Sequence, residues 1–458
     1  MVEGARLESE YTAKPYRGFE SLPLRHFCLY QRRMELRATP SGPLAGIAAI
    51  PGDKSCSHRA LILGALADGE TRITGLLESD DVMATVRAVE AFGGRIEQTG
   101  EEWLVSGSEW RSPTEPIDCG NSGTTARLLM GAASGFKLTA AFTGDASLAS
   151  RPMARVTAPL ARMGARFDGG DRLPIRLHGG DLGGIDWLNE PPSAQIKSAV
   201  LLAGLRSRGS VMVREPEPSR DHTEIMLREF GCEIETAGGS AVLGAWRQLR
   251  GCHIRIGADP SSAAFALTAA ALVPGSSVEV QDVLVNPLRT GLFEALEEMG
   301  AAVGLSGERL QSGEIVAGLR VGPAPLRPIE IPAERISAMI DEIPLLAIAA
   351  ACADGESVIH GLAELRHKES DRLGALVAGL IACGVTALVK GDRLHIFGRR
   401  KVRGRATIAA QGDHRIAMAF LVLGLAADEP VAVDSAEMIA TSFPGFVETM
   451  RALGADIG

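Results

Sequence analysis

Two kinds of helical pattern alternate along the chain. A helix that is apolar on nearly every side is buried, and this pattern occurs in the runs ALILGALA, TARLLMGAA, IKSAVLLAGL, AAFALTAAALV, IPLLAIAAACA and IAMAFLVLGLA. The second kind is apolar on one face only, as at Val86, Val89 and Phe92. Alternating positions, as in SVMVRE after Gly209, predict strands between the helices. The pattern predicts a unit of a buried helix, a strand, an amphipathic helix and two further strands.

This unit repeats with a nearly constant period. Each amphipathic helix ends near a glycine, as expected where the backbone enters the left-handed region, and the six glycines are Gly93, Gly164, Gly231, Gly300, Gly384 and Gly454. Their spacings are 71, 67, 69, 84 and 70 residues, with an insertion of 12 residues between Gly300 and Asp341. Six units exceed one core, so we expect two domains of three units, with crossings near Gly52 and Gly257.

Both ends of the chain deviate from the repeat. The last unit stops just after Gly454 without its closing strands, and we expect residues 35–50 to supply them. Both ends of the folded chain would then belong to one domain. The three tyrosines, Tyr11, Tyr16 and Tyr30, all precede residue 34, where the repeat begins. We therefore expect residues 1–33 to be a dispensable N-terminal extension.

The composition excludes several classes of function. The 458 residues are 46% hydrophobic and carry a net charge of −9, which argues against a nucleic-acid-binding surface. The seven cysteines are scattered and form no CxxC pair. They predict reduced thiols in a cytoplasmic protein and no thiolate metal site. No apolar run reaches the roughly 18 residues that a membrane span needs, so we expect neither nucleic acid nor membrane among the partners.

The buried helices begin at polar segments that carry cations. A helix start leaves N–H donors free for anions, and ordinary N-capping would explain any one of the six starts. Capping does not need the cations and amides found at four of them, which are Lys54, Arg59, Arg127, Gln195, Lys197 and Arg415. Further basic residues lie in non-helical segments, at Arg151, Arg220, Lys368 and Arg372. This gathering predicts a pocket for a strongly anionic ligand with phosphate or carboxylate groups.

Six motifs follow one another from about Met34 to the C-terminus: PGDKSxSHR from Pro51, GNSGTTxR from Gly120, Arg151-Pro152-Met153, Ser193-Ala194-Gln195, KExDR from Lys368 and DHRxAM from Asp413. Together they resemble the 3-phosphoshikimate 1-carboxyvinyltransferase family, also called EPSP synthases. The resemblance implies an α/β fold, a two-domain inside-out barrel of six βαβαββ units, three per domain. The domains would be residues 34–52 plus 258–458 and residues 53–257, with the active site between them.

The resemblance also implies a reaction. The enolpyruvyl group of phosphoenolpyruvate is transferred to the 5-hydroxyl group of shikimate 3-phosphate, by addition and elimination, and phosphate is released. The product leads through the shikimate pathway to chorismate and aromatic amino acids. No metal or organic cofactor is implied, and we expect a monomer whose partners are these two small molecules.

Roles for individual residues follow from the resemblance. Shikimate 3-phosphate is expected to bind Lys54, Ser55, Arg59, Ser193, Ala194, Gln195, Arg220, Asp341 and Lys368. Phosphoenolpyruvate is expected to bind Lys54, Gly123, Arg151, Gln195, Arg372 and Arg415. Asp341 is expected to take the hydroxyl proton and Glu369 to protonate the enol carbon, for which domain closure and desolvation would have to raise the pKa of Glu369. Lys54 would share the proton transfers and stabilise the leaving phosphate.

Structural explanations stay open for several of these residues. Asp341 precedes a buried helix, which N-capping alone would explain. Glu369 lies between two cations, which charge balance would explain. We interpret His58 and His414 as orienting hydrogen-bond partners and the pair Asp221-His222 as ordering a loop.

Three segments resemble the second, glyphosate-tolerant class of the family: residues 52–55, 193–197 and 220–224. Two features differ, because the run from Asn286 to Arg289 lacks the threonine of that class and position 123 is glycine rather than alanine. An alanine methyl group at position 123 would crowd glyphosate, a phosphonate longer than phosphoenolpyruvate. We therefore expect glyphosate to inhibit this chain.

Three other functions compete with this interpretation. UDP-N-acetylglucosamine enolpyruvyl transferases share the fold but place a reactive cysteine before the Arg-Pro, and residues 143–148 contain none. A non-catalytic module for phosphorylated metabolites would have no use for Asp341 and Glu369. An RNA-end-processing relative of the fold is opposed by the acidic charge of the chain.

Overall fold

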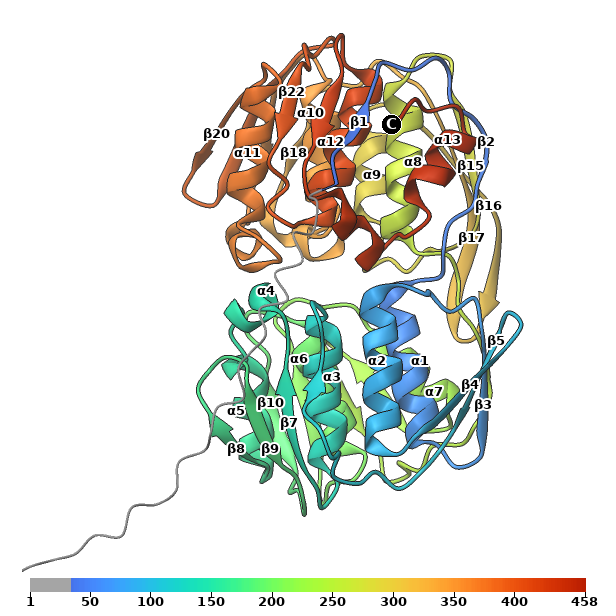
Figure 1. Cartoon of the computed structure of the whole chain (residues 1–458), viewed down its shortest axis with the longest axis vertical. Coiled ribbons are helices and arrows are strands. Elements are labelled where there is room, and N and C mark those ends of the chain that lie inside the picture. The colour runs from blue at the N-terminus through green and yellow to red at the C-terminus, as the bar shows by residue number, and fades with distance from the viewer. Residues whose placement is uncertain (1–33) are drawn as a thin grey trace, which may run out of the picture. The chain divides into compact units, whose positions relative to one another are not determined.

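The computed structural model of the chain describes residues 34–458, whose buried hydrophobic side chains form two cores. The first core is built mainly from residues between Cys56 and Ile256, and the elements around it are called the insert lobe. The second core is built from residues 36–48 and 258–457. The elements around it are called the terminal lobe, because both ends of the described segment lie there (Figure 1). The predicted extension, residues 1–33, lies outside the described residues.

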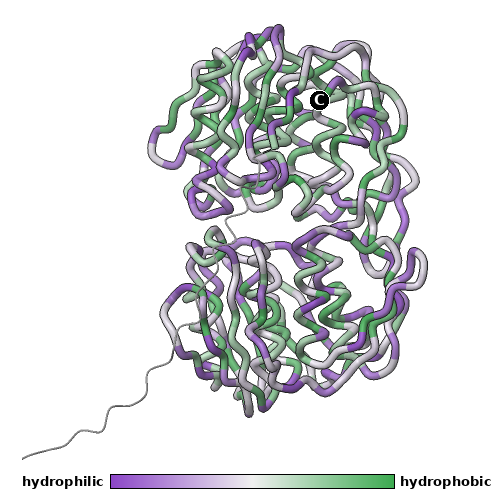
Figure 2. The backbone as a smooth tube through the Cα atoms, in the orientation of Figure 1, coloured by the Kyte–Doolittle hydropathy of each residue, from purple (hydrophilic) through white to green (hydrophobic). Residues whose placement is uncertain are grey.

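Six helices are buried on nearly all sides, as the apolar runs predicted. Three form the centre of the insert lobe and three that of the terminal lobe: α1 (Lys54–Leu66), α3 (Gly123–Ser134), α6 (Ala194–Gly204), α8 (Pro260–Leu272), α10 (Ile343–Ala351) and α12 (His414–Ala426). Their hydrophobic residues give the green inner stretches of the tube in Figure 2. Within residues 34–458, no helix is both long enough and apolar enough to cross a membrane.

One amphipathic helix follows in each unit: α2 (Asp80–Phe92), α5 (Ala154–Met163), α7 (His222–Glu229), α9 (Gly291–Glu298), α11 (Arg372–Ala382) and α13 (Phe446–Ala452). Gly93 after α2 and Gly454 after α13 both have a φ of 103°, the left-handed conformation that was predicted. The shorter helices are α4 (Ala146–Ser150) and the 3₁₀ turns η1 (Ala333–Ala338), η2 (Ala363–His367) and η3 (Ala436–Thr441).

The insert lobe contains three four-stranded sheets with one plan. The first strand of each sheet is parallel to the second, and the other pairings are antiparallel. The strand orders are β14 (His253–Arg255)–β3 (Glu70–Thr74)–β5 (Glu102–Ser106)–β4 (Arg95–Thr99), β6 (Ile117–Asp118)–β7 (Thr139–Thr143)–β9 (Ile175–His178)–β8 (Arg166–Gly169), and β10 (Ile185–Leu188)–β11 (Val211–Arg214)–β13 (Ser240–Leu243)–β12 (Ile234–Ala237).

The terminal lobe repeats this plan with one exception, because its last sheet has three strands. The orders are β2 (Ala45–Ala48)–β15 (Ser277–Leu284)–β17 (Glu314–Gly322)–β16 (Ala302–Gln311), β18 (Glu330–Ile331)–β19 (Gly355–Ile359)–β21 (Arg393–Gly398)–β20 (Thr386–Lys390), and β22 (Ala406–Ile408)–β23 (Val431–Val433)–β1 (Leu36–Ala38). The prediction for residues 35–50 is half right. β1 closes the last sheet, antiparallel to β23, whereas β2 joins the fourth unit in parallel with β15.

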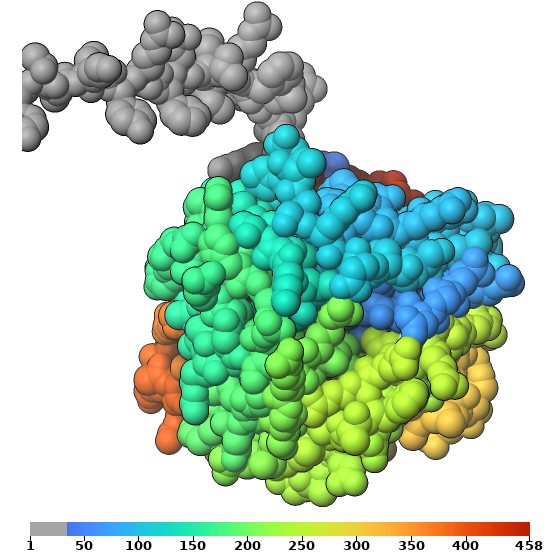
Figure 3. Space-filling view, turned by 90° about the horizontal axis from the view of Figure 1, so that it is seen from below, coloured from blue at the N-terminus to red at the C-terminus, as the bar shows by residue number. Residues whose placement is uncertain are grey.

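The insertion of 12 residues lengthens one hairpin. β16 and β17 contain 10 and 9 residues, whereas the corresponding strands of the other complete sheets contain four to six. The longer hairpin reaches the insert lobe, where Val316 packs in the first core and the Ser312 hydroxyl accepts a hydrogen bond from the Arg255 N–H at 2.9 Å. Figure 3 shows the golden surface of the hairpin beside the yellow-green surface of the segment that contains β14.

The chain passes between the two cores at two adjacent points. Gly52 and Ala258 form an antiparallel bridge, and the N–H group of Asp53 donates to the carbonyl of Gly257 at 2.8 Å. A Cβ atom on Gly52 would lie 1.8 Å from the carbonyl oxygen of Gly75, so a side chain does not fit there. This pairing holds the start of α1 beside the start of α8, one from each lobe.

Candidate active site

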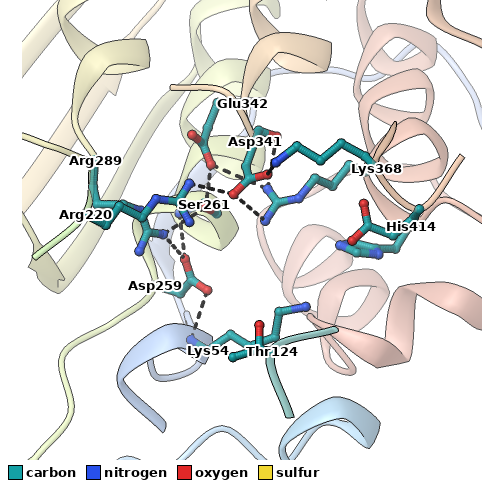
Figure 4. A network of polar contacts seen from close by, with 12 residues as sticks. Lys54, Thr124, Arg220, Asp259, Ser261, Arg289, Asp341, Glu342, Lys368 and His414 are labelled. Atoms are coloured by element: carbon teal, nitrogen blue, oxygen red, sulfur yellow. Dashed lines mark hydrogen bonds and ion pairs between the residues drawn. The ribbon is translucent and has the colours of Figure 1, made fainter. Parts of the chain in front are cut away.

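Asp341 lies at the centre of a cluster of cations. It precedes α10, but the N-cap of that helix is the next residue, so the interpretation of Asp341 as a simple cap is wrong. Arg220 donates from Nη2 to Asp341 Oδ2 at 2.5 Å, and Lys368 Nζ lies 3.5 Å from Oδ1 (Figure 4). The guanidinium groups of Arg372 and Arg415 approach the same carboxylate to 3.6 and 3.9 Å. Four cations therefore share one partly buried carboxylate.

These cations decide the ionisation of Asp341. Burial by itself raises the pKa of this carboxyl group, but Lys368 and the three guanidinium groups outweigh burial and hold the pKa well below its usual range. Asp341 is therefore ionised and, with all four cations in place, a weak base. An anionic ligand that took over these cations would raise the pKa of Asp341 and strengthen it as a base.

Glu369 is the second carboxylate of the site and contacts both lobes. Arg372 donates a short hydrogen bond to Oε2, and Arg151 Nη1 of the insert lobe lies 3.6 Å from Oε1. The hydroxyl of Ser147, also in the insert lobe, donates to the backbone carbonyl of Glu369 at 3.1 Å. Burial raises the pKa of Glu369, but the positive charges of Arg372 and Arg151 outweigh burial. The pKa of this carboxyl group therefore lies well below its usual range. In this arrangement Glu369 therefore does not have the raised pKa that its expected role as a proton donor requires.

Arg127 and Arg151 of the insert lobe donate hydrogen bonds to neutral side chains, and Arg151 does so in addition to its contact with Glu369. Arg151 donates from Nη2 to the side-chain oxygen of Asn121 at 3.1 Å. Arg127 donates from Nη1 to Gln195 Oε1 at 3.0 Å, and Gln195 Nε2 donates to the Thr124 hydroxyl at 2.9 Å. Burial, together with the neighbouring Arg151, lowers the pKa of Arg127 to about 10. The starts of α3 and α6 are joined in this way without a carboxylate.

Lys54 and Arg59 lie in the first turns of α1. The structure pairs Lys54 Nζ with Asp81 at 3.0 Å rather than with Asp341 or Glu369. Arg59 is 3% exposed, and its three nitrogen atoms each have a protein partner. These partners are the Thr223 hydroxyl at 2.7 Å, the Ser198 hydroxyl at 2.7 Å and the Ser55 carbonyl at 2.9 Å. The remaining N–H groups of the guanidinium are left for a ligand.

The other predicted ligands also lie at helix starts. Ser193 is the N-cap of α6 but forms no side-chain capping bond, so its hydroxyl group does not satisfy the N–H donors at this helix start. Ala194 is the first residue of α6, Gly123 is the first residue of α3 and Ser55 is the second residue of α1. These four residues therefore all lie at the starts of the buried helices of the insert lobe.

The two histidines of the motifs are buried. Burial lowers the pKa of both His58 and His414 well below the usual range, so both rings are neutral. The Nδ1 atom of His58 pairs with the Thr85 hydroxyl at 2.7 Å, and that of His414 with the Thr441 hydroxyl at 3.3 Å. These contacts fit the interpretation of the two rings as orienting partners.

Sequence reasoning missed the carboxylates that hold the cations. Asp413 caps α12 and also accepts a hydrogen bond from Arg372 Nε at 2.9 Å. Glu342 lies 3.5 Å from Arg415 Nη1. Acidic residues at helix starts look like ordinary caps in a sequence, so only the fold shows what they neutralise. Three buried nitrogen atoms near these groups have no hydrogen-bond partner within residues 34–458: Arg151 Nε, Arg372 Nη1 and His414 Nε2.

A second buried cluster has the spacing of a metal site. Ligand atoms of Asp53, Cys56 and His222 lie within 4.8 Å of one another. Arg289 Nη1, however, lies 2.9 Å from Asp53 Oδ2 and 3.1 Å from His222 Nε2. Burial also raises the pKa of the Cys56 thiol well above its usual value, which disfavours a thiolate ligand. A guanidinium group repels a cation at this point, so the geometry favours an ion-pair cluster over a metal site.

Comparisons with known proteins agree with this geometry. Residues 38–450 match the family described as EPSP synthase (3-phosphoshikimate 1-carboxyvinyltransferase). A protein named 3-phosphoshikimate 1-carboxyvinyltransferase from Phenylobacterium zucineum is 53% identical over 431 residues, covering 92% of this chain and 95% of that protein. One of the same name from Caulobacter vibrioides is 51% identical over 435 residues, covering 92% of this chain and 98% of that protein.

Solved structures give the same result. EPSP synthase from Acinetobacter baumannii superposes with a TM-score of 0.82 at 39% identity, covering 93% of this chain and 99% of that one. The chain also shares its fold with the enolpyruvyl transferase NikO from Streptomyces tendae. That superposition has a TM-score of 0.73 at 20% identity and covers 93% of this chain and 98% of the NikO chain. The chain therefore belongs to the EPSP synthase (3-phosphoshikimate 1-carboxyvinyltransferase) family and has the two-domain fold of the enolpyruvyl transferases.

Proposed function

We propose that this chain performs the reaction of its family. It transfers the enolpyruvyl group of phosphoenolpyruvate to the 5-hydroxyl group of shikimate 3-phosphate and releases phosphate, a step of the shikimate pathway. The observation that carries the proposal is the carboxylate of Asp341 within 3.9 Å of four cations. Both substrates are polyanions, and cations fixed in a buried site bind such groups strongly.

Shikimate 3-phosphate is proposed to lie mainly against the insert lobe. The start of α6, with Ser193, Ala194 and Gln195, has no side-chain cap, and such a start suits a phosphate group. Asp341 would face the 5-hydroxyl group from the terminal lobe. The other proposed ligands of this substrate are Lys54, Ser55, Arg59, Arg220 and Lys368.

Phosphoenolpyruvate is proposed to lie between Arg151 of the insert lobe and Arg372 of the terminal lobe. Both contact Glu369, and each has a buried nitrogen atom without a hydrogen-bond partner among the described residues. Unpaired buried donors of this kind are explained by a ligand that accepts from them. The other proposed ligands of this substrate are Lys54, Gly123, Gln195 and Arg415.

The proposed addition step forms a bond between the 5-oxygen of shikimate 3-phosphate and C2 of phosphoenolpyruvate. Asp341 accepts the hydroxyl proton, and Glu369 delivers a proton to C3. In the elimination step the C3 proton is removed again, and phosphate leaves C2 with its bonding electrons. Lys54 is placed to share the proton transfers and to stabilise the leaving phosphate, since a fixed cation stabilises charge that develops there.

An exchange of ion pairs has to accompany binding, because cations hold both carboxylates in the ionised form. The carboxylate and phosphate of phosphoenolpyruvate compete with Glu369 for Arg151 and Arg372. Once these cations bind the substrate, burial becomes the main influence on Glu369 and raises its pKa towards the range of a proton donor. The same exchange at Asp341 strengthens it as a base.

We also propose that the two lobes are two domains, residues 34–52 plus 258–458 and residues 53–257, which close on the substrates. Their separate cores support this division. All proposed ligands come from one chain, which supports a monomer as the active form. The six cysteines within the described residues are free, which supports a cytoplasmic location.

Within the family, we propose that the chain stands nearest the second class but is inhibited by glyphosate. Lys197 and Glu224, from two segments that resemble that class, form a buried ion pair at 2.8 Å. A Cβ atom on Gly123 would lie 2.5 Å from Arg127 Nη1 and 3.4 Å from Arg151 Nη1. Glycine therefore keeps space for a phosphonate beside the cations that bind phosphoenolpyruvate.

The test is the release of phosphate from phosphoenolpyruvate with either shikimate 3-phosphate or UDP-N-acetylglucosamine as acceptor. We expect release only with shikimate 3-phosphate. Release only with the sugar nucleotide would overturn the proposal. A reaction without acceptor and the variant Asp354→Asn, whose carboxylate pairs with Arg400 on the surface, serve as controls.

A further inference from the structure

A buried polar cluster lies where the chain crosses between the lobes, beside the proposed ligands but not among them. Its centre is Arg289, whose side chain is 2% exposed. Arg289 ends the segment of residues 286–289, which lacks the threonine of the second class of the family. Figure 4 shows Arg289 beside Asp259 and Ser261. Burying a full charge is costly unless it is paired and hydrogen-bonded. The partners of Arg289 therefore indicate what this charge does.

Arg289 binds two carboxylates that come from different lobes. Its Nη1 atom donates to Asp53 Oδ2 at 2.9 Å, and its Nη2 atom lies 3.3 Å from Asp259 Oδ1. Burial disfavours the charge of the guanidinium, but Asp53 and Asp259 outweigh burial and raise the pKa of Arg289. The guanidinium group therefore stays charged across the physiological pH range.

These two carboxylates are the N-caps of α1 and α8. Asp53 Oδ1 accepts from the N–H group of Cys56 at 2.7 Å, and Asp259 Oδ1 accepts from that of Ser261 at 2.7 Å. Asp259 Oδ2 also accepts from the N–H group of Lys54 at 3.3 Å. Arg289 therefore fixes the first turn of α1, where Lys54 begins the helix.

A second connection leads from Arg289 to Asp341. Arg289 Nη2 donates to the Ser261 hydroxyl at 3.0 Å, and that hydroxyl donates a short hydrogen bond to Glu342 Oε1. Glu342 is the N-cap of α10 and the neighbour of Asp341 in the chain. One guanidinium group is thus linked to the segment of Lys54 and to the segment of Asp341.

A third connection leads to the loop that carries Arg220. Arg289 Nη1 donates to His222 Nε2 at 3.1 Å, so the ring proton is assigned to Nδ1, which donates to Glu314 Oε1 at 2.6 Å. Glu314 begins β17 in the long hairpin. Asn286 holds the adjacent Asp221 at 2.8 Å. The loop that presents Arg220 to Asp341 is therefore fixed from the terminal lobe.

We propose that Arg289 is a positioning residue for the transfer reaction. It holds Lys54, Arg220 and Asp341, which come from three separate segments, in one geometry. The inference rests on the proposed function, because it requires these three residues to act on the substrates. Since a displacement of about 1 Å can lower a catalysed rate about a hundredfold, loss of this group should lower turnover in addition to the stability that is lost when two buried carboxylates lose their cation.

The test compares Arg289→Met and Arg289→Lys with the parent enzyme in kcat, in KM for both substrates and in thermal unfolding temperature. We expect Arg289→Met to lower kcat about ten- to a hundredfold, with smaller changes in KM. Arg289→Lys should restore part of kcat, because its ammonium group reaches one carboxylate. The control is Arg247→Met, which removes bonds to four backbone carbonyls in the insert lobe. It should lower the unfolding temperature and leave kcat unchanged.

An unchanged kcat in Arg289→Met, with a loss of stability like that of Arg247→Met, would overturn the inference. If Arg289→Met does not fold, the variant His222→Leu is measured instead, because it removes the connection between Arg289 and the loop of Arg220. A several-fold lower kcat in His222→Leu supports the inference, and an unchanged kcat contradicts it. Lys54→Met and Asp341→Asn are measured in parallel. If these two retain full activity, the proposed function of the site fails and the inference with it. If they lose activity while Arg289→Met keeps it, only the inference fails.

Discussion

The two lobes hold the cations of the site in different ways. In the insert lobe, Arg127 and Arg151 donate to the amide oxygens of Gln195 and Asn121. In the terminal lobe the arginines and Lys368 are held by carboxylates, as Arg372 is by Asp413 and Glu369. Neutral partners leave the positive charge available to an anion, whereas carboxylates cancel it until an anion competes for the cation.

This difference suggests a division of labour. The insert lobe, with partly uncompensated charge, is suited to bind the anionic substrates. The terminal lobe carries Asp341 and Glu369, the two carboxylates proposed to accept and deliver the protons of the addition and elimination steps, with Lys54 of the insert lobe sharing these transfers. Three insert-lobe cations depart from the rule, because Lys54 is paired with Asp81, and Arg151 and Arg220 lie against the terminal-lobe carboxylates of Glu369 and Asp341. The following predictions test the division, from the largest expected effect to the smallest.

The largest effect is expected on the terminal side, in Glu369→Gln. Glutamine keeps the size of the side chain and accepts the bond from Arg372, but it cannot deliver a proton. We expect kcat to fall about 10²- to 10⁴-fold with KM nearly unchanged, as measured by initial rates of phosphate release. The control Glu364→Gln alters an exposed pair with Arg155 at 3.6 Å and should keep full activity. An unchanged kcat in Glu369→Gln would remove the proposed role.

A smaller effect of another kind is expected on the insert side, in Gln195→Ala. The change removes the one side-chain acceptor of Arg127 among the described residues, whose other acceptors are backbone carbonyls, and it removes the donor to Thr124. A hydrogen bond to a charged group contributes about 1.5–3 kcal/mol, so we expect KM to rise about ten- to a hundredfold and kcat to change less. Substrate titrations measure both constants, with Gln248→Ala, at an exposed contact to Asp68, as control. A loss confined to kcat would contradict the division between the lobes.

Gly123→Ala tests the space beside the insert-lobe arginines. The added Cβ atom would lie 2.5 Å from Arg127 Nη1, so that flexible guanidinium has to shift. We expect glyphosate to inhibit the parent enzyme and to inhibit Gly123→Ala less, with a smaller loss of affinity for phosphoenolpyruvate. Dose–response curves at fixed phosphoenolpyruvate give the comparison. Gly445→Ala, where a Cβ atom meets nothing within 4 Å, is the control. A parent enzyme that resists glyphosate would refute the prediction.

The smallest effect concerns stability and should be alike in both lobes. His58 and His414 are buried with their pKa lowered well below the usual range. As pH falls through about 6.5, the unfolded chain binds protons that the folded chain does not bind, so the free energy of unfolding decreases. The expected slope is up to about 1.4 kcal/mol per pH unit for each histidine. Urea unfolding between pH 8 and pH 5 measures it, and His58→Leu should reduce the slope. A flat profile would contradict the buried, neutral rings.

Much of the framework could be predicted from the sequence, because buried helices and helix-ending glycines leave strong local patterns. Gly93 and Gly454 show this, since each has the predicted left-handed conformation. The partner of β2 could not be predicted, because a strand of four residues contains little information on pairing. The neutralising carboxylates were missed for a related reason. Arg289 and Asp53, for example, lie 236 positions apart in the chain and meet only in the fold.

The central claim is that the terminal-lobe carboxylates move protons and are not needed for binding. Asp341→Asn tests it most directly, by calorimetric titration with shikimate 3-phosphate together with the rate of phosphate release. Neutralising this carboxylate frees four cations for the ligand. The account predicts binding at least as tight as in the parent enzyme and a turnover lower by about 10²- to 10⁴-fold. A loss of affinity that parallels the loss of turnover, or an unchanged turnover, would contradict it.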